Sequence, residues 1–448
     1  MNLTDRPVNA PEGEVAEMVH HRWLALLALA LALAGPAAAQ TLRIGILGPM
    51  AFVQGEHTWY GATLAAEELN RAGGIAVGNQ RYRIELVRVD TNEMTSVTDA
   101  ATAVERAITA QRVDFLVGGF RSEAVLAMTE VAADYRKVFL ITGAALDGIL
   151  AGRVDRNYDR FKYLFRVSPT KSSDLARTSL LLLGEVIQAV RRDLRVERPK
   201  VAILAERAAW ADPLVETASR LIAAPAPQGY ASEVVGTWRP SATATDVTPE
   251  LTAIQRAGAQ VIFTVLSGPV GVPFGRDWGR LKIPAAPVGI NVEAQQETWL
   301  KATDNLGAYV ATLNTLAPSV AITPKTIPFI ANFQARFRQF PIYTASGAYA
   351  ALYILADALQ RAGTTAADAV VRALEATDYV GPSGRLVFDR THDITWGPGY
   401  TTGLGVQWIE GRMQAFWPRQ WRVGNQVVSY AGVRPYQLPP WVVEAWRR

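Results

Sequence analysis

The feature that most constrains this fold is an alternation of strand-like and helix-like segments in residues 41–147. Four runs with β-branched residues are separated by Ala-rich segments with helical spacing. Those runs are residues 41–48, 83–90, 114–119 and 137–141. Strands that alternate with helices predict right-handed crossovers and a parallel sheet. Ligand sites on such sheets lie in the loops beyond the carboxyl ends of the strands. The candidate loops are therefore residues 48–55, 118–123 and 142–147.

A second α/β unit follows the first. A polar segment at 148–163 is expected to be a loop, and residues 174–192 form a long amphipathic pattern typical of a helix. From residue 200 to residue 290 the alternation of strands and helices resumes. We therefore expect an α/β fold with two doubly wound parallel-sheet lobes. The expected division is 40–167 with 293–384 for the first lobe, 168–292 with 385–417 for the second, and a Trp-, Pro- and Arg-rich tail at 418–448 whose role stays open, either wrapping a lobe or partly disordered.

The N-terminal region predicts export. Residues 24–34 are almost purely Leu and Ala, with a basic segment before them and an Ala-rich segment after them. This is typical of a secretory signal peptide cleaved after Ala39. The run is about half as long as a membrane span, which needs about 20 apolar residues; the alternative is a buried N-terminal helix. Residues 1–17 are polar and acidic, so Met18 is an alternative start.

Composition excludes several classes of site. The absence of cysteine excludes disulfides, thiolate ligands, a cysteine nucleophile and a lipid-modified cysteine, so we expect a soluble periplasmic protein. The net charge of +4 is small and its Lys and Arg are scattered, which disfavours nucleic acid as a partner. After signal removal His57 and His392 remain, in no metal-binding spacing and beside no nucleophile elbow. Asp389, His392 and Asp393 are close in sequence, but a turn with solvated charges is the commoner arrangement. We expect no enzymatic activity, metal or cofactor.

Several strings taken in order carry a family resemblance. They are residues 42–49 followed by Gly61 and Ala62, then 68–75 with a Leu-Asn-x-x-Gly-Gly-Ile pattern, 113–119, 165–169 and 381–384. Together they resemble the periplasmic solute-binding proteins of ABC importers of the branched-chain amino acid (Leu/Ile/Val) type, the type I periplasmic binding proteins. The resemblance covers about residues 41–417. It implies two α/β lobes joined by a three-strand hinge, with the ligand enclosed in the cleft between them.

The resemblance also implies ligand-binding residues in the first lobe. Ser122 matches the serine that holds a ligand carboxylate, and a helix N-terminus suits an anion. The alternative is that Ser122 only caps the helix. The loop with Thr142, Ala144, Ala145 and Leu146 matches the family's loop that holds the ligand's amino and carboxylate groups; alternatively it is an ordinary turn at the end of a strand.

In the second lobe the match is less complete. Trp210 matches an aromatic residue that faces the cleft, Ser267 lies near a second aromatic position, and Asn291 lies near the acid that pairs with the ligand ammonium. An Asn offers no full charge to a buried cation, although Glu293 is close enough in sequence to take that role. Leu146 replaces a Thr or Ser of the family. These departures predict poor affinity for leucine, isoleucine and valine.

Large and polar side chains also crowd the first loop. Phe52, Gln54, His57 and Trp59 have the reach to contact the mouth of the cleft, whereas the alternative places Trp59 and Tyr60 on the core face of a helix.

The sequence thus predicts a periplasmic substrate-binding protein of an ABC importer. It would capture a small polar organic solute (an amino acid, a carboxylate or an amide-like compound) by hinge closure. We expect a monomer whose partners are the permease and ATPase subunits of the importer. The alternative is a periplasmic sensing subunit that reports the same solute to a membrane receptor. An exported enzyme is disfavoured because no nucleophile–base pair is evident.

Overall fold

The first sheet has six strands in the order β2-β3-β1-β4-β5-β6. The computed structural model describes Met1 and residues 40–447, so the predicted signal peptide, its cleavage after Ala39 and the alternative start at Met18 lie outside the described residues. The strands are β1 (Gln40–Gly48), β2 (Ile75–Val77), β3 (Gln80–Asp90), β4 (Phe115–Gly118), β5 (Phe139–Ile141) and β6 (Leu164–Arg166). β1 pairs with β4, β4 with β5 and β5 with β6, all in parallel. The predicted parallel sheet is confirmed.

Helices cover both faces of this sheet. Ile44 and Ile46 of β1 lie in the core under α2 (Val53–Arg71) and α12 (Tyr343–Ala362). Leu47 points to the opposite face, under α3 (Val97–Thr109) and α4 (Ser122–Asp134). Because both of their faces are buried, β1, β4 and β5 read as nearly continuous apolar runs, whereas most residues of β3 are at least partly exposed.

Helices α2 and α12 pack closely because of a glycine. A Cβ atom at Gly61 would lie 2.0 Å from the carbonyl oxygen of Ala345, so only glycine fits where the two helices meet. α11 (Thr326–Phe337) and α13 (Ala367–Glu375) join this first lobe by packing against α2 and α12 respectively. A hairpin of β12 (Asp378–Gly381) and β13 (Gly384–Val387) contains residues 381–384, one of the strings that carry the resemblance.

The second lobe is built on a four-stranded sheet in the order β10-β9-β7-β8, in which every pair is parallel. Its strands are β7 (Lys200–Ala205), β8 (Glu233–Trp238), β9 (Val261–Leu266) and β10 (Ala286–Asn291). Side chains alternate again: Val201 and Ile203 face the core under α6 (Ser172–Leu194) and α7 (Asp212–Ala223). Ala202 and Leu204 face α8 (Thr248–Arg256) and α9 (Gly271–Arg280).

Two local features differ from the sequence prediction. The prediction named no helix at residues 271–280, where the structure has α9. Gly275 and Gly279 are needed there for space, since a Cβ atom would lie 2.3 Å from Trp299 and 2.0 Å from the carbonyl oxygen of Leu306. The segment 148–163, expected to be a loop, contains η1 (Asp147–Ile149) and α5 (Tyr158–Phe161).

A third, antiparallel sheet changes the expected lobe boundary. It consists of β11 (Ala311–Asn314), β14 (Leu404–Ile409) and β15 (Arg412–Trp417). The expected division placed β11 with the first lobe, but β11 pairs with β14 and its Thr312 hydroxyl accepts a hydrogen bond from the backbone of Asn291. We therefore propose that β11 belongs to the second lobe. The chain then passes between the lobes three times, after β6, β11 and β13.

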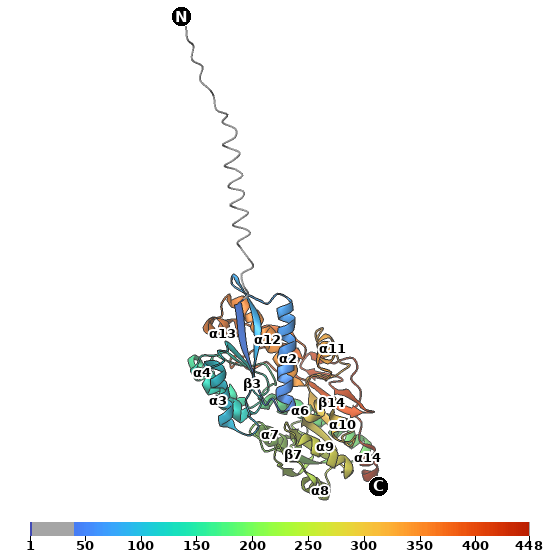
Figure 1. Cartoon of the computed structure of the whole chain (residues 1–448). Coiled ribbons are helices and arrows are strands. Elements are labelled where there is room, and N and C mark those ends of the chain that lie inside the picture. Colours follow the sequence, from blue (N-terminus) through green and yellow to red (C-terminus); the bar gives the residue numbers. More distant parts are fainter. Residues whose placement is uncertain (2–39, 448) are drawn as a thin grey trace. The chain divides into compact units, whose positions relative to one another are not determined.

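The C-terminal tail wraps the second lobe. After the hairpin β16 (Trp421–Val423) and β17 (Gln426–Val428), the chain ends in α14 (Pro440–Trp446), beside α9 in Figure 1. The indole nitrogen of Trp441 donates to the carbonyl of Ile283 at 3.1 Å, and that of Trp446 donates to the carbonyl of Pro284. Val442 is fully buried. Tail residues thus complete a core of this lobe.

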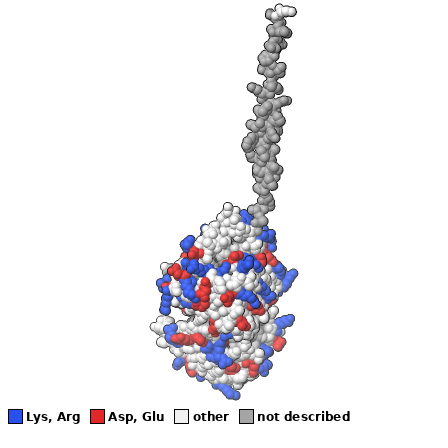
Figure 2. Space-filling model, turned by 60° about the vertical axis from the view of Figure 1, so that its left-hand side comes forward, with Lys and Arg blue, Asp and Glu red and all other residues white. Residues whose placement is uncertain are grey.

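Charges of both signs are interspersed on the surface that Figure 2 shows, as the scattered Lys and Arg of the sequence indicate. Within the part of the chain that the structure describes, no helix has the length and apolar character needed to cross a bilayer.

Candidate functional site

A cavity of about 180 Å³ is lined by loops from the carboxyl ends of strands in both lobes. The first lobe contributes Phe120, Arg121 and Ser122 after β4, and Gly143 and Ala145 after β5. These residues belong to two of the three predicted loops. The third predicted loop, residues 48–55, contributes none of the lining residues.

The second lobe contributes the ends of three strands. Glu206 and Trp210 follow β7, Ser267 and Gly268 follow β9, and Ile290 lies near the end of β10. The rule that ligands bind beyond the carboxyl ends of parallel strands therefore holds for both lobes.

Most of the wall is apolar. Its large side chains include the aromatic residues Phe120, Trp210 and Tyr343 and the aliphatic residues Ile290 and Leu313. The hydroxyl of Tyr343 donates to the carbonyl of Gly143 at 3.2 Å, which ties α12 to the loop after β5. Burial raises the pKa of Tyr343, so its hydroxyl stays protonated. Such a wall suits an apolar body with few polar groups.

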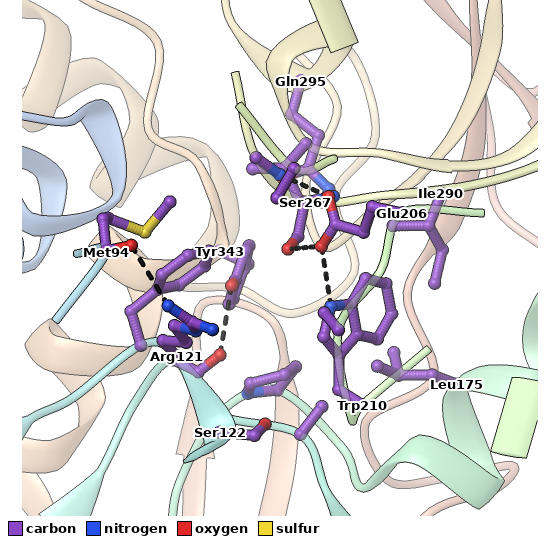
Figure 3. A pocket seen from close by; sticks show the side chains of 18 of the residues that line it. Met94, Arg121, Ser122, Leu175, Glu206, Trp210, Ser267, Ile290, Gln295 and Tyr343 are labelled. Atoms are coloured by element: carbon purple, nitrogen blue, oxygen red, sulfur yellow. Dashed lines mark hydrogen bonds between the residues drawn. The ribbon is translucent and has the colours of Figure 1, made fainter. Parts of the chain in front are cut away.

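Glu206 is the central polar group of the second-lobe side. Its carboxylate is buried and accepts the backbone N–H groups of Ser267 and Gly268 at 2.8 and 2.9 Å. It also accepts the indole N–H of Trp210 at 2.9 Å and the hydroxyl of Ser267 (Figure 3). Four donors therefore surround one carboxylate. Sequence reasoning missed Glu206, although an acid directly after an apolar strand was a signal that could have found it.

Ser122 does not cap its helix, contrary to the alternative considered from the sequence. It is the first residue of α4, and Arg121 occupies the N-cap position. The Ser122 hydroxyl oxygen accepts the backbone N–H of Leu146 at 3.2 Å. The side chain therefore links the two first-lobe loops at the cavity.

The loop before α4 is held by a second buried acid. One oxygen of Glu93 accepts the backbone N–H groups of Phe120 and Arg121 at 2.9 and 2.8 Å, and the other accepts the Thr91 hydroxyl at 2.8 Å. Burial raises the pKa of Glu93. These bonds fix the backbone from which Phe120 and Arg121 extend towards the cavity.

Arg121 is a cation on the first-lobe side of the cavity. Its Nη1 donates to the carbonyl of Met94 at 3.1 Å, and its Nε lies 3.4 Å from a carboxylate oxygen of Glu123. Figure 3 shows Arg121 and Glu206 on different sides of the cavity.

The predicted site residues divide into two groups. Ser122, Ala145, Trp210 and Ser267 line the cavity. The remaining six do not: Phe52, Gln54, Thr142, Ala144, Leu146 and Asn291.

Three of these six lie behind the first-lobe loops. Thr142 is fully buried, and its hydroxyl has no hydrogen-bond partner among the described residues. Ala144 is buried in the core under α3 and α4, and Leu146 packs against that core. The side chain of each thus points away from the cavity, although the backbone of Leu146 bonds to Ser122.

The other three lie at contacts inside the protein. Asn291 is fully buried, and its Nδ2 donates to the carbonyl of Gly271 at 3.2 Å. Gln54 is fully buried and donates across the cleft to the carbonyl of Ser267 at 3.0 Å and to Glu293 at 3.3 Å. Phe52 is half-buried directly before α2.

Glu293, the alternative partner for a ligand ammonium, also lies outside the lining. Its carboxylate accepts hydrogen bonds from Gln54 and Gln296, the latter at 2.6 Å. Burial raises the pKa of Glu293 to about 7.

A second hydrogen bond joins the two lobes. Glu123, in the first turn of α4, accepts the backbone N–H of Ala209 at 2.9 Å. Together with the Gln54–Ser267 bond, it joins the two lobes directly. The described arrangement is thus a closed one.

A buried ion pair stands where the chain leaves the first lobe. The Nε of Arg166 lies 2.8 Å from a carboxylate oxygen of Asp393, with both side chains almost fully buried. The angle at the N–H is not that of a hydrogen bond, so the contact is mainly electrostatic. The Arg166 guanidinium also donates to the carbonyls of Ala145 and Leu146. Burial raises the pKa of Asp393 to about 6, and the charge of Arg166 opposes that rise.

The short Asp389–Asp393 segment is not built as a metal site. Both ring nitrogens of His392 face oxygens, of Leu164 at 3.0 Å and of Glu375 at 3.1 Å, while Asp393 faces Arg166. Among the described residues, no three His, Asp or Glu side chains are grouped to hold a metal ion.

Comparison with known proteins supports the same architecture. The family model described as "Periplasmic binding protein" matches residues 41–404. A solved structure of the branched-chain amino acid transporter substrate-binding protein LivJ from Streptococcus pneumoniae, in complex with isoleucine, is 19% identical. The match covers 84% of this chain and 98% of that one, with a TM-score of 0.68.

Two further structures are similar to the same extent. A solute-binding protein of an ABC transporter from R. palustris, in complex with benzoate, is 17% identical, with 88% and 99% of the two chains covered and a TM-score of 0.67. Another from Rhodopseudomonas palustris BisB5, in complex with 3,4-dihydroxybenzoic acid, is 18% identical, with 89% and 99% covered and a TM-score of 0.66. At these identities the structural likeness shows the fold.

Proposed function

This chain belongs to the periplasmic binding protein family, and we propose that it is the substrate-binding component of an ABC importer. Like the other proteins of its family, the chain is a solute-binding protein and not an enzyme. In the proposal, it works in the periplasm as a monomer and delivers a small organic solute to the permease and ATPase subunits.

The observation that carries the proposal is the cavity between the lobes, lined from both sheets. Apolar walls from Phe120, Trp210 and Ile290 surround a few polar groups, which is the usual make-up of a small-molecule site. Proteins of the same fold bind isoleucine, benzoate and 3,4-dihydroxybenzoic acid, all of them small carboxylates. We propose that Ser122, Ala145, Trp210 and Ser267 contact the solute.

Capture would proceed by hinge closure. The chain passes between the lobes three times, so the lobes are able to rotate about these segments without unfolding. A solute that touches both lobes stabilises the closed form by its differential affinity for that form. The bonds Gln54–Ser267 and Glu123–Ala209 would form in the same movement.

The direct test is identification of whatever molecule co-purifies with the protein. We expect mass spectrometry after denaturation to release one small organic compound in a near-stoichiometric amount. Adding that compound to refolded protein should raise the unfolding temperature, and Trp210→Ala should abolish the increase.

If no compound is released and no metabolite in a thermal-shift screen stabilises the protein, solute capture in this cavity is refuted. Transport is tested separately by affinity capture from solubilised membranes: recovery of a permease and an ATPase supports it, whereas recovery of a membrane receptor alone would replace transport by sensing.

A further inference from the structure

We propose that the solute is an organic carboxylate that carries no ammonium group, and that Arg121 is its counter-charge. This inference rests on the proposed solute-binding function and names the chemical class of the ligand. It depends on which charged groups of the cavity are free to contact a ligand.

The carboxylate of Glu206 is not free. It lines the cavity, but Ser267 donates to it through its backbone and its hydroxyl, and Gly268 and Trp210 donate as well. A carboxylate accepts at about four positions, and four donors already fill them. An ammonium group could reach Glu206 only by displacing a donor that would then be left buried without a partner.

The other nearby carboxylates are also committed, and none of them lines the cavity. Glu93 holds the backbone of Phe120 and Arg121. Glu123 holds the backbone N–H of Ala209, and Glu293 is bonded to glutamine side chains. Around this cavity the described residues therefore offer a ligand ammonium no unoccupied carboxylate.

Arg121 offers the opposite. It lines the cavity and is half-buried, whereas the other lining arginine, Arg207, has an exposed side chain. Only two of the three nitrogen atoms of Arg121 are engaged: Nη1 with Met94 and Nε, at 3.4 Å, with Glu123. Nη2 has no hydrogen-bond partner among residues 40–447. A guanidinium binds carboxylates through parallel N–H groups. Glu206 then acts as a positioning residue, because it fixes Trp210 and the Ser267 loop opposite Arg121 (Figure 3).

The rest of the wall defines the body of the ligand. Phe120, Trp210, Ile290 and Leu313 make most of the exposed wall apolar, and the neutral amide of Gln295, whose Oε1 has no hydrogen-bond partner among the described residues, also lines it. The volume of about 180 Å³ is close to that of an engineered protein cavity of about 150 Å³ that binds benzene. An aromatic ring or a short branched chain with one carboxylate fits both properties.

The test uses compounds that differ in one group. The first set is 4-methylpentanoate, its amide and leucine; the second is 3-phenylpropanoate, its amide and phenylalanine; benzoate and benzamide form a third pair. Titration calorimetry on protein freed of co-purified ligand should show that at least one carboxylate binds tenfold or more tightly than its amide and its α-amino acid.

Variants then locate the charge. Arg121→Gln should weaken binding of the carboxylate at least tenfold and change binding of the amide less than threefold, and Arg121→Lys should restore part of the loss. Arg160→Gln is the matched control, because Arg160 is an exposed first-lobe arginine paired with Glu130 and Asp134.

Each outcome decides the inference. Tighter binding of leucine or phenylalanine than of the matched carboxylate would overturn it while leaving solute capture intact, as would equal loss of acid and amide in Arg121→Gln. If none of these compounds binds, the charge of the co-purified molecule decides: an acid without an amine supports the inference, and an amine overturns it. Absence of any ligand would overturn the inference and the proposed function together.

Discussion

Replacing Asp393 by asparagine tests whether burial or the charge of Arg166 dominates at the hinge. Asp393 is fully buried, one of its oxygens lies 2.8 Å from Arg166, and no hydrogen bond from a described residue reaches its carboxylate. Burial accordingly raises its pKa from 3.8 to about 6. Arg166 thus offsets only part of the desolvation of the carboxylate.

The sign of the effect follows from linkage. A carboxyl group with a raised pKa binds its proton more tightly in the folded state than in the unfolded one. The wild-type protein therefore loses stability as the pH rises from about 4 to about 6, and Asp393→Asn lacks this loss. A difference of about 2 pKa units corresponds to about 3 kcal/mol over a pH range that extends beyond both pKa values. Between pH 4 and pH 6 the free energy of unfolding of the variant should therefore rise by about 2 kcal/mol relative to that of the wild type.

Urea unfolding followed by tryptophan fluorescence between pH 4 and pH 8 measures this difference. Arg166→Met should have the opposite effect at pH 7.5: its free energy of unfolding should fall by about 3–5 kcal/mol, because the replacement leaves the buried carboxylate of Asp393 without a partner. The double replacement Arg166→Met/Asp393→Leu is the control and should be far milder than Arg166→Met alone. If the stability of the wild type instead increases relative to that of Asp393→Asn as the pH rises, the Arg166–Asp393 ion pair is net favourable and the reasoning is refuted.

Three further predictions concern the core and the cleft. Burial raises the pKa of Glu293 to about 7. In urea unfolding, the free energy of unfolding of Glu293→Gln should therefore rise by about 2–3 kcal/mol relative to the wild type between pH 4.5 and pH 7. A difference that does not change with pH would contradict this. Gly61→Ala should cost about 1–3 kcal/mol because its Cβ would overlap a carbonyl of α12, whereas Gly148→Ala, with open space around it, should change stability by less than about 0.5 kcal/mol. Glu123→Ala removes the bond to Ala209 at a partly exposed site, worth about 1 kcal/mol, and should make the ligand-free protein more open in small-angle X-ray scattering; an unchanged profile would show that this bond does not favour closure.

The two parallel sheets could be predicted because their strands are buried on both faces. Ile44, Ile46 and Leu47 all have to be apolar because helices cover both sides of β1. The resulting apolar run can be recognised in a single sequence. Helix α9 could not be predicted in the same way. Its glycines serve close packing against Trp299 and the backbone of Leu306, which lie later in the chain.

The candidate site was predictable in its position but not in its charges. The topology of parallel sheets places the loops after β4 and β5 at a cleft, and the resemblance picks Ser122 and Trp210 within the right loops. Whether a polar side chain faces a ligand depends on what else bonds to it. Gln54 has the reach to contact a solute, yet it bonds to the opposite lobe.

Asn291 and Glu206 show why the ligand's charge needs the structure. The family resemblance suggests Asn291 for the ammonium-binding position, but the Asn291 side chain lies against Gly271, where an added Cβ atom would be 2.2 Å from the Oδ1 of Asn291. The acid that does line the cavity, Glu206, stands after a different strand, and its four donors come from Trp210 and from the consecutive residues Ser267 and Gly268. A carboxylate counts as a cation site only while its acceptor positions are open. Trp210 and the Ser267 loop fill those positions on Glu206. An acid at this position in the sequence would suggest an amino acid ligand, but the hydrogen bonds of Glu206 in the structure argue against one.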